Sequence, residues 1–234
     1  MRTISRAGTK GAVAGALAAM TMAMIPGQAT AADLGPTASP DAYVKWLEGK
    51  SDAGANEVAK QFKALPAEKQ TKFLEDLKDP ELNKNFLSAG SGDKAAVRAA
   101  NAAGDAVVES GTEGGEGTGG IAARAASDDR WASHWVTDTL FGIKVTKVEL
   151  KVRYRVSGGK VTKVLGSAAS YYNYVPATSF KNTPVKEWVS AAPASNAHAE
   201  TTWTGDITGL AEWSCVHHIW ADGRGLIKGE LKRV

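Results

Sequence analysis

The side chains best suited to chemistry are four histidines and one cysteine, all in the second half of the chain. His217 and His218 are adjacent, so in a β-strand they face opposite sides and cannot readily share a metal ion. Cys215 lies two residues before His217 and shares its face, as a thiol–imidazole pair would. His198 and Glu200 share a face of an earlier expected strand in the same way. The sequence therefore offers two same-face pairs of reactive side chains.

These pairs do not extend into a recognisable catalytic or metal motif. A nucleophile is usually displayed on a tight turn or at a helix start, whereas Cys215 lies within an expected strand, Trp213 to Trp220. No Gly-x-Ser-x-Gly elbow and no phosphate-binding Gly-x-x-x-x-Gly-Lys-Ser/Thr loop occurs in the sequence, and His134 follows no metal-site spacing. We therefore expect no metal and no cofactor. The residues that a hydrolase would use are Cys215, His217, His198 and Glu200.

Aromatic residues give a better candidate for recognition. Six of the seven tryptophans follow residue 127, and three tyrosines, Tyr171, Tyr172 and Tyr174, lie close together. Strand alternation must turn one of the first two rings outward, and tyrosine suits interfaces because it offers both an apolar ring and a hydrogen bond. We predict that these three tyrosines form a recognition surface.

Residues 143–164, IKVTKVELKVRYRVSGGKVTKV, predict a long β-hairpin. From Val148 to Val156 apolar and charged residues alternate, which gives one apolar and one charged face. Gly158 and Gly159 suit the tight turn. A two-residue loop would set Tyr154 opposite Lys163, whereas one additional loop residue sets it opposite Val164, and we expect the second, bulged version because it keeps the apolar face continuous. The charged face is a second candidate binding surface, formed by Lys147, Lys151, Arg153, Arg155 and Lys163.

The elements around this hairpin predict an α+β multidomain protein. Alternating runs and turn residues continue to the C-terminus, which indicates an antiparallel β-sandwich over residues 128–234. Short helical patterns, the first opened by Ser39-Pro40, indicate a helical segment over residues 32–110. Glycine-rich residues 111–127 predict a flexible linker, in which Arg124 is an expected site of proteolytic cleavage.

The first 31 residues have the form of a secretory signal peptide. Basic residues precede an uninterrupted small and apolar run, residues 11–25, and Ala29-Thr30-Ala31 suits a signal peptidase that cleaves after Ala31. The apolar run is shorter than the roughly 20 residues that a membrane-spanning helix needs. We expect a secreted, extracellular protein of bacterial type with no membrane span, and its single cysteine excludes an internal disulfide.

Charge bears on the class of partner. Three of the 28 Lys and Arg residues lie in the leader, so 25 remain against 25 Asp and Glu. Residues 32–127 carry 11 basic and 15 acidic residues, and residues 128–234 carry 14 and 10, so the two halves are complementary. The mature chain lacks the basic excess of a nucleic-acid-binding protein.

Together these features favour a secreted, non-enzymatic binding or adaptor protein. Its expected partner is an extracellular protein, as in a secreted inhibitor or toxin complex, and an anionic cell-wall polysaccharide is a second class of partner. One alternative is a secreted hydrolase made as a precursor, with the helical half as its pro-segment. Another is a glycan-binding module that uses its Trp and Tyr side chains.

Overall fold

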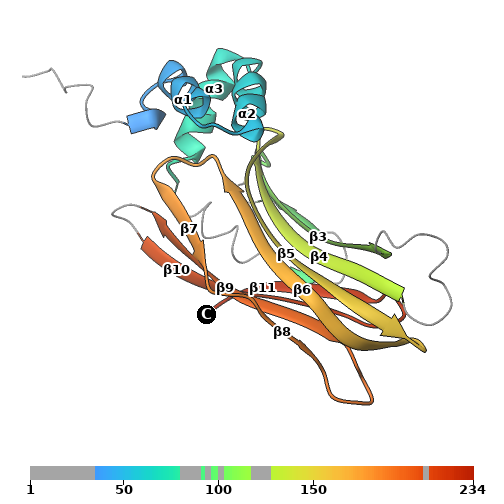
Figure 1. Cartoon of the computed structure of the whole chain (residues 1–234). Coiled ribbons are helices and arrows are strands. Elements are labelled where there is room, and N and C mark those ends of the chain that lie inside the picture. The colour runs from blue at the N-terminus through green and yellow to red at the C-terminus, as the bar shows by residue number, and fades with distance from the viewer. Residues whose placement is uncertain (1–34, 80–90, 93–95, 100–102, 117–127, 208–210) are drawn as a thin grey trace, which may run out of the picture. The chain divides into compact units, whose positions relative to one another are not determined.

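The computed structural model describes residues 35–79, 91–92, 96–99, 103–116, 128–207 and 211–234. These residues form three α-helices and two antiparallel β-sheets (Figure 1), which confirms the predicted α+β composition. The helices are α1 (Pro40–Glu48), α2 (Ala53–Lys63) and α3 (Ala67–Asp76), preceded by the 3-10 turn Gly35–Thr37. In the described ranges no helix is long and apolar enough to cross a membrane.

The strands divide into two sheets, called sheet B and sheet A. Sheet B has the order β2-β3-β4-β5-β6, and its strands are β2 (Ala96–Ala99), β3 (Ala106–Glu116), β4 (Asp128–Leu140), β5 (Ile143–Ser157) and β6 (Lys160–Asn173). Sheet A has the order β1-β11-β10-β9-β7, with β8 also paired to β9. Its strands are β1 (Ser91–Gly92), β7 (Thr178–Asn182), β8 (Lys186–Val189), β9 (Ala197–Ile207), β10 (Ala211–Ala221) and β11 (Ile227–Arg233).

The predicted hairpin is formed by β5 and β6. Gly158 and Gly159 have φ angles of 56° and 74°, the positive values that a two-residue reversal requires. The register then shifts, and Tyr154 pairs with Val164, as predicted. Val156 pairs with Val161, but Arg155 pairs with Lys163. The additional residue is therefore Thr162, which lies within β6 and not in the turn. This bulge keeps the apolar side chains of both strands on one face.

The two sheets share two buried apolar clusters. One joins Val136 and Val148 of sheet B to Trp203 of sheet A. The other joins Leu150 of sheet B to Ile219 of sheet A. All five side chains are at most 1% exposed, and burying each stabilises the fold by about 1.5–3 kcal/mol. The even-numbered face of β5, predicted to be apolar, therefore packs against the other sheet.

The helices are capped locally and packed onto one end of sheet B. Ser39 Oγ accepts the Ala42 N–H at 3.2 Å at the start of α1, as the Ser-Pro pattern predicts. The apolar stripes of the three helices meet at the rings of Tyr43, Phe62 and Phe73, whose centroids lie 5.0 to 5.6 Å apart. The same buried cluster contains apolar residues of β4 and β5, and the helices and both sheets belong to one compact unit.

The structure differs from the expected helical segment and linker. Residues 96–99 form β2 and residues 106–116 form β3, so the last part of the segment 32–110 and the first part of the linker 111–127 are strands. Residues 117–127, with Arg124, lie outside the described residues, as does the leader with its expected cleavage at Ala31.

Glycines in β3 reflect close packing. A Cβ atom added to Gly111 would lie 2.8 Å from the ring of Trp135, and one added to Gly115 would lie 3.2 Å from Nε1 of Trp131. Both tryptophans come from the neighbouring strand β4, and each is paired in register with the glycine that it covers. A side chain at either position would force an indole ring to move, which favours glycine there.

Candidate functional site

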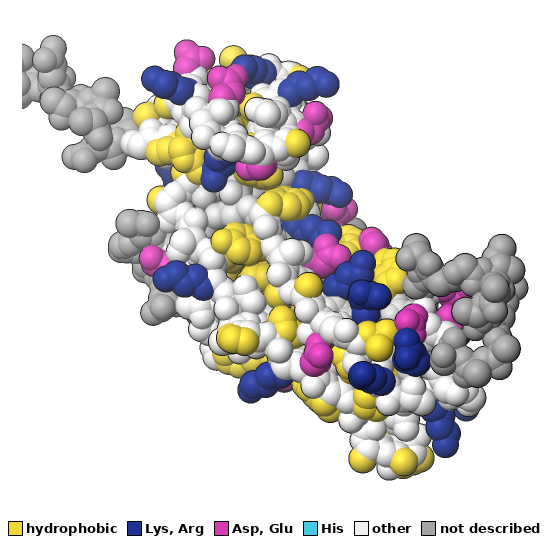
Figure 2. All heavy atoms as spheres, viewed as in Figure 1, with side chains coloured by type: hydrophobic (Ala, Val, Ile, Leu, Met, Phe, Trp, Pro, Cys, Tyr) yellow, Lys and Arg dark blue, Asp and Glu magenta, His cyan; other side chains and the backbone are white. Residues whose placement is uncertain are grey.

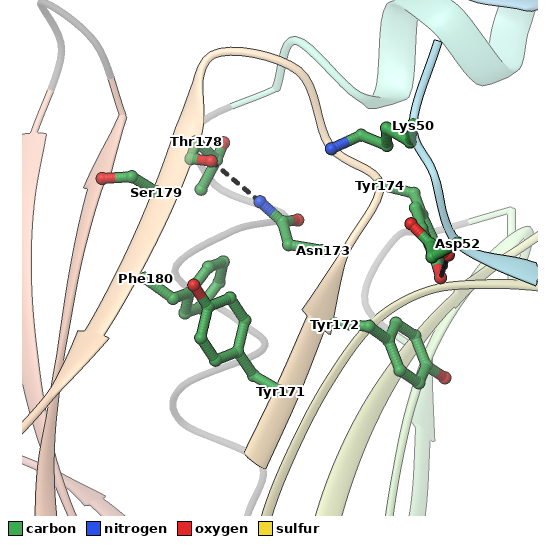
Figure 3. Close-up of a pocket in the computed structure, with 9 residues that line it drawn as sticks. All are labelled: Lys50, Asp52, Tyr171, Tyr172, Asn173, Tyr174, Thr178, Ser179 and Phe180. Carbon is green, nitrogen blue, oxygen red and sulfur yellow. Dashed lines mark hydrogen bonds between the residues drawn. The ribbon is translucent and has the colours of Figure 1, made fainter. Parts of the chain in front are cut away.

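A pocket of about 620 Å³ lies between the α1–α2 connection and the turn that carries the chain from sheet B to sheet A (Figure 3). Two of its residues precede α2, and the others belong to the end of β6, the following turn and the start of β7. The lining residues are Lys50, Asp52, Tyr171, Tyr172, Asn173, Tyr174, Thr178, Ser179 and Phe180. The structure therefore brings the three predicted tyrosines together around one cavity.

Tyr171 and Phe180 form an apolar wall of the pocket. Their ring centroids lie 5.8 Å apart, and Figure 3 shows the two rings side by side. Behind them, the fully buried Trp203 meets Tyr171 edge to face at 5.9 Å. The core thus fixes the ring of Tyr171 while 49% of that residue stays exposed, which makes it available for contact with a ligand.

Tyr172 points to the opposite side of β6 from Tyr171, as strand alternation predicts (Figure 3). Its ring is half-buried and stacks on that of Tyr174, with centroids 5.3 Å apart. Burial raises the pKa of the Tyr172 hydroxyl. The pair forms a second aromatic wall, and the buried ring of Tyr174 anchors it.

Tyr174 joins the pocket to the helices through two hydrogen bonds. Its hydroxyl donates to Asp52 Oδ1 at 2.7 Å, and its carbonyl oxygen accepts from the Tyr43 hydroxyl at 2.8 Å. Asp52 Oδ1 also accepts the Ala55 N–H at 2.7 Å and so caps α2. The Tyr174 hydrogen bond lowers the pKa of Asp52, whereas burial, followed by this bond, raises the pKa of Tyr174. The carboxylate is therefore ionised at neutral pH and already engaged.

Asn173 fixes the turn between the two sheets. Its Oδ1 accepts from the Thr146 hydroxyl and from the Val175 N–H, both at 3.1 Å. Its Nδ2 donates to the Thr178 carbonyl at 2.9 Å, which is the dashed line in Figure 3. One side chain thus holds both ends of the turn, so the pocket is preorganised and a ligand would not have to order it.

Lys50 supplies the positive charge of the pocket. Its Nζ lies 4.3 Å from the ring centroid of Trp46, a cation–π distance. None of the ion pairs within the described residues involves Lys50. In Figure 3 this ammonium group points toward the turn beside Asn173, where it can hold a polar or anionic group.

The predicted charged surface is present on the outer face of sheet B, but three of its cations have partners within the chain. Lys147 pairs with Glu149 at 2.7 Å, and Lys151 Nζ lies 4.2 Å from the ring centroid of Trp131. The guanidinium of Arg155 donates two hydrogen bonds to the carboxylate of Asp129, at 2.7 and 3.1 Å. In Figure 2 the basic side chains over β5 and β6 lie among acidic ones. This face is therefore less free to attract an acidic partner than the sequence suggested; its members are Lys147, Lys151, Arg153, Arg155 and Lys163.

Cys215 and His217 share the inner face of β10, as predicted, but they are not arranged as a nucleophile and its base. Cys215 is fully buried, and burial raises the pKa of its thiol to about 11. His217 accepts the Trp203 Nε1–H at Nδ1, at 3.1 Å, and its Nε2 lies 2.7 Å from Nδ1 of His134. Both imidazole nitrogens are therefore engaged, and neither is left to deprotonate the thiol.

His198 and Glu200 share the outer face of β9, but His198 contacts a different residue. Its Nδ1 lies 3.1 Å from Nε2 of His218 on β10. Within the described ranges, no group of three His, Cys, Asp or Glu side chains could hold a metal ion. The candidate hydrolase residues are thus distributed over both faces of sheet A, without a common cavity among the described residues.

Sequence reasoning missed the half of the pocket formed by Lys50, Asp52 and the Thr178–Phe180 segment. The sequence could have indicated Asp52, because an aspartate just before a helical pattern is a typical N-cap. The five residues of β7 contain one large apolar side chain, which is too little for an alternation pattern. Lys50 has no local signal, because only the fold brings it to β6.

The fold and the pocket define an α+β protein with an aromatic, preorganised pocket. Comparison with known proteins found no family model, no curated protein and no solved structure that matches this chain.

Proposed function

We propose that this chain is exported and acts outside the cell as a non-enzymatic binding protein, in which the two sheets form an antiparallel β-sandwich. The shared apolar clusters between the sheets support the sandwich, and the leader pattern of residues 1–31 supports export. The observation that carries the function is the pocket, in which Asn173 holds the turn at Thr178 and Asp52 holds the hydroxyl of Tyr174.

The proposed partner is an extracellular protein that inserts a short segment into this pocket. An apolar side chain of that segment would pack on Tyr171 and Phe180, because exposed aromatic residues in well-packed pockets contribute most to protein binding. A neighbouring carboxylate would pair with Lys50, which has no ion pair within the described residues. An apolar residue beside an acidic one is therefore the expected recognition element.

Packing of the helices supports their retention in the mature protein. Tyr43, Phe62 and Phe73 share a buried cluster with Leu140 and Ile143 of sheet B. Removal of the helical half as a pro-segment would expose this cluster to water, at about 25 cal/mol for each Å² of apolar surface. The helical half would then serve as one wall of the binding site.

The proposal is tested with the protein secreted into culture medium and used as bait in the same medium. Export and retention predict an intact mass that begins at Ala32. A stoichiometric protein partner should bind the wild type, and Tyr171→Ala or Lys50→Glu should weaken this binding by about tenfold or more. Lys69→Glu, at an exposed position of α3, is the matched control and should bind as the wild type does. Equal binding by all variants would reject the pocket.

A further inference from the structure

A second aromatic cluster lies on the outer face of sheet A, away from the pocket. It contains Trp188 of β8, His198 of β9, and His218 and Trp220 of β10. Trp188 pairs in register with His198, and His198 pairs with Trp220 on its other side. Because residues paired across antiparallel strands project from the same face, this cluster crosses three strands.

The two histidines of this cluster form one nearly flat surface. Nδ1 of His198 and Nε2 of His218 lie 3.1 Å apart, the ring centroids lie 5.3 Å apart, and the planes differ by 19°. The distance between the centroids exceeds the distance between the nitrogens by about the width of one ring. The two imidazoles therefore lie edge to edge, with the bonded nitrogens facing each other. A hydrogen bond between the facing nitrogens holds them in this arrangement.

Trp188 lies flat over both imidazoles. Its plane is 5° from that of His198 and 19° from that of His218, with centroids 4.8 and 5.6 Å away. One face of the indole is thus covered, yet Trp188 is 39% exposed. The exposed area must therefore belong mainly to the opposite face and the edges of the ring. The imidazoles fix the ring orientation, so this face is available without further ordering.

We propose that the exposed face of Trp188 binds a pyranose ring of an extracellular polysaccharide. The C–H groups of a flat sugar ring gain dispersion energy against an indole face. Hydroxyl groups around that ring need both donors and acceptors, and Lys186 and Glu200 provide them from one cross-strand pair beside Trp188. Neither side chain has a hydrogen bond or ion pair to another described residue.

The balance of charge favours a sugar over a strongly charged ligand. Lys186 and Glu200 form a cross-strand pair on the same face as Trp188, and their opposite charges balance each other. An acidic segment would be repelled by Glu200, and a basic segment by Lys186. A neutral polyhydroxylated ring meets neither penalty. The site shares no residue with the pocket, so either proposal can fail while the other holds.

The test uses the full secreted chain with soluble cellotetraose and chitotetraose, which are chains of β-1,4-linked pyranose rings. Titration at millimolar concentration should change the tryptophan fluorescence in a saturable way with at least one of them. Trp188→Ala should weaken this binding by about tenfold or more, and Trp188→Phe should weaken it less because a smaller ring remains. The control is Trp131→Ala on the other sheet, with the unfolding transition of every variant recorded.

Two results would overturn the proposal. The first is the absence of saturable binding to either sugar by a folded wild-type protein. The second is binding that Trp188→Ala leaves intact or that Trp131→Ala abolishes equally in a folded variant. Saturable binding of an acidic or basic peptide to Trp188, with no sugar binding, would count against a polysaccharide ligand and assign this surface to a protein partner.

Discussion

Two histidine pairs, built from adjacent residues of one strand, lie in opposite environments. His217 faces the core, where its Nε2 lies 2.7 Å from Nδ1 of His134 on the other sheet. His218 faces outward, where its Nε2 lies 3.1 Å from Nδ1 of His198. Both members of the inner pair are fully buried, whereas both members of the outer pair are partly exposed. The same nitrogen-to-nitrogen contact therefore joins two sheets in one case and supports a surface ring in the other.

Trp203 fixes the positions of the protons in the inner pair. An indole N–H can only donate, so Nδ1 of His217 accepts it and carries no proton. Neutral His217 then carries its proton on Nε2, which donates to Nδ1 of His134. The proton of His134 is consequently on Nε2, a buried atom without a hydrogen-bond partner in the described part of the chain. The inner pair is a directed chain of hydrogen bonds that begins at an indole and ends in the core.

Burial lowers the histidine pKa values in both pairs, but the two pairs differ in what opposes this effect. It lowers the pKa of His134 to about 4 and lowers the pKa of His217 well below its ordinary value. In the outer pair burial also lowers the pKa of both histidines, but at His218 the carboxylates of Glu200 and Glu230 oppose it. The inner pair is thus held neutral by the fold.

The largest expected effect comes from breaking the inner pair. His217→Ala removes the partner of both Trp203 and His134 and leaves a cavity between the sheets. An unsatisfied buried group costs about 1–3 kcal/mol, and truncation of a large core side chain adds a comparable amount. We expect a loss of about 3–5 kcal/mol in the free energy of unfolding, measured by urea denaturation at pH 7.5. A loss below about 1 kcal/mol would show that the chain of hydrogen bonds contributes little.

Adjacent histidines also show what the sequence could predict. Alternation assigned His217 and His218 to opposite faces, and it placed Cys215 on the same face as His217. It could not pair His217 with His134, because that contact joins strands 83 residues apart on different sheets. Periodicity identifies the face of a side chain, and the partner across the core depends on how the sheets pack.

Glycines in β3 show why part of the fold was mispredicted. Composition alone made residues 111–127 a linker, because glycine without bulky neighbours usually indicates flexibility. In β3 the bulky groups come from β4, where Trp131 and Trp135 cover Gly115 and Gly111. The glycines of β3 and the tryptophans that cover them lie in different segments of the sequence. Neither segment alone indicates that the two strands pair. The missed half of the pocket has the same cause, since Lys50 and Phe180 come to line one pocket only after folding.

Acidification should weaken the fold through the inner pair. His134 has a pKa of about 4 in the fold and about 6.5 when unfolded. Below about pH 6.5 the imidazole of His134 is protonated in the unfolded chain but stays neutral in the folded chain. Stability is therefore complete above that pH and falls as the pH drops toward 4. At pH 5 the loss through His134 is about 2 kcal/mol, and His217 adds a loss in the same direction. Urea denaturation at pH 7.5 and pH 5 measures it.

Asp138 must be replaced for this measurement, because it titrates in the opposite sense. Burial raises the pKa of its carboxyl to about 7, against about 3.9 when unfolded. Its contribution is therefore present at low pH and is lost as the pH rises through 7. In an Asp138→Asn background the acid-induced loss of the histidines should stand alone. Equal stability at pH 7.5 and pH 5 in that background would contradict the assignment of a neutral, buried pair.

The smallest effect is expected from the outer pair and completes the comparison. His218→Ala removes one half of the flat surface under Trp188, but His198 and His218 are both partly exposed, unlike the fully buried inner pair. We expect a loss below about 1 kcal/mol in the same urea experiment, because substitutions of partly exposed side chains usually change stability little. If His218→Ala destabilised the protein as much as His217→Ala, the outer pair would be part of the structural core. A small loss of stability would show that the outer cluster contributes little to folding, as expected of a surface that serves binding.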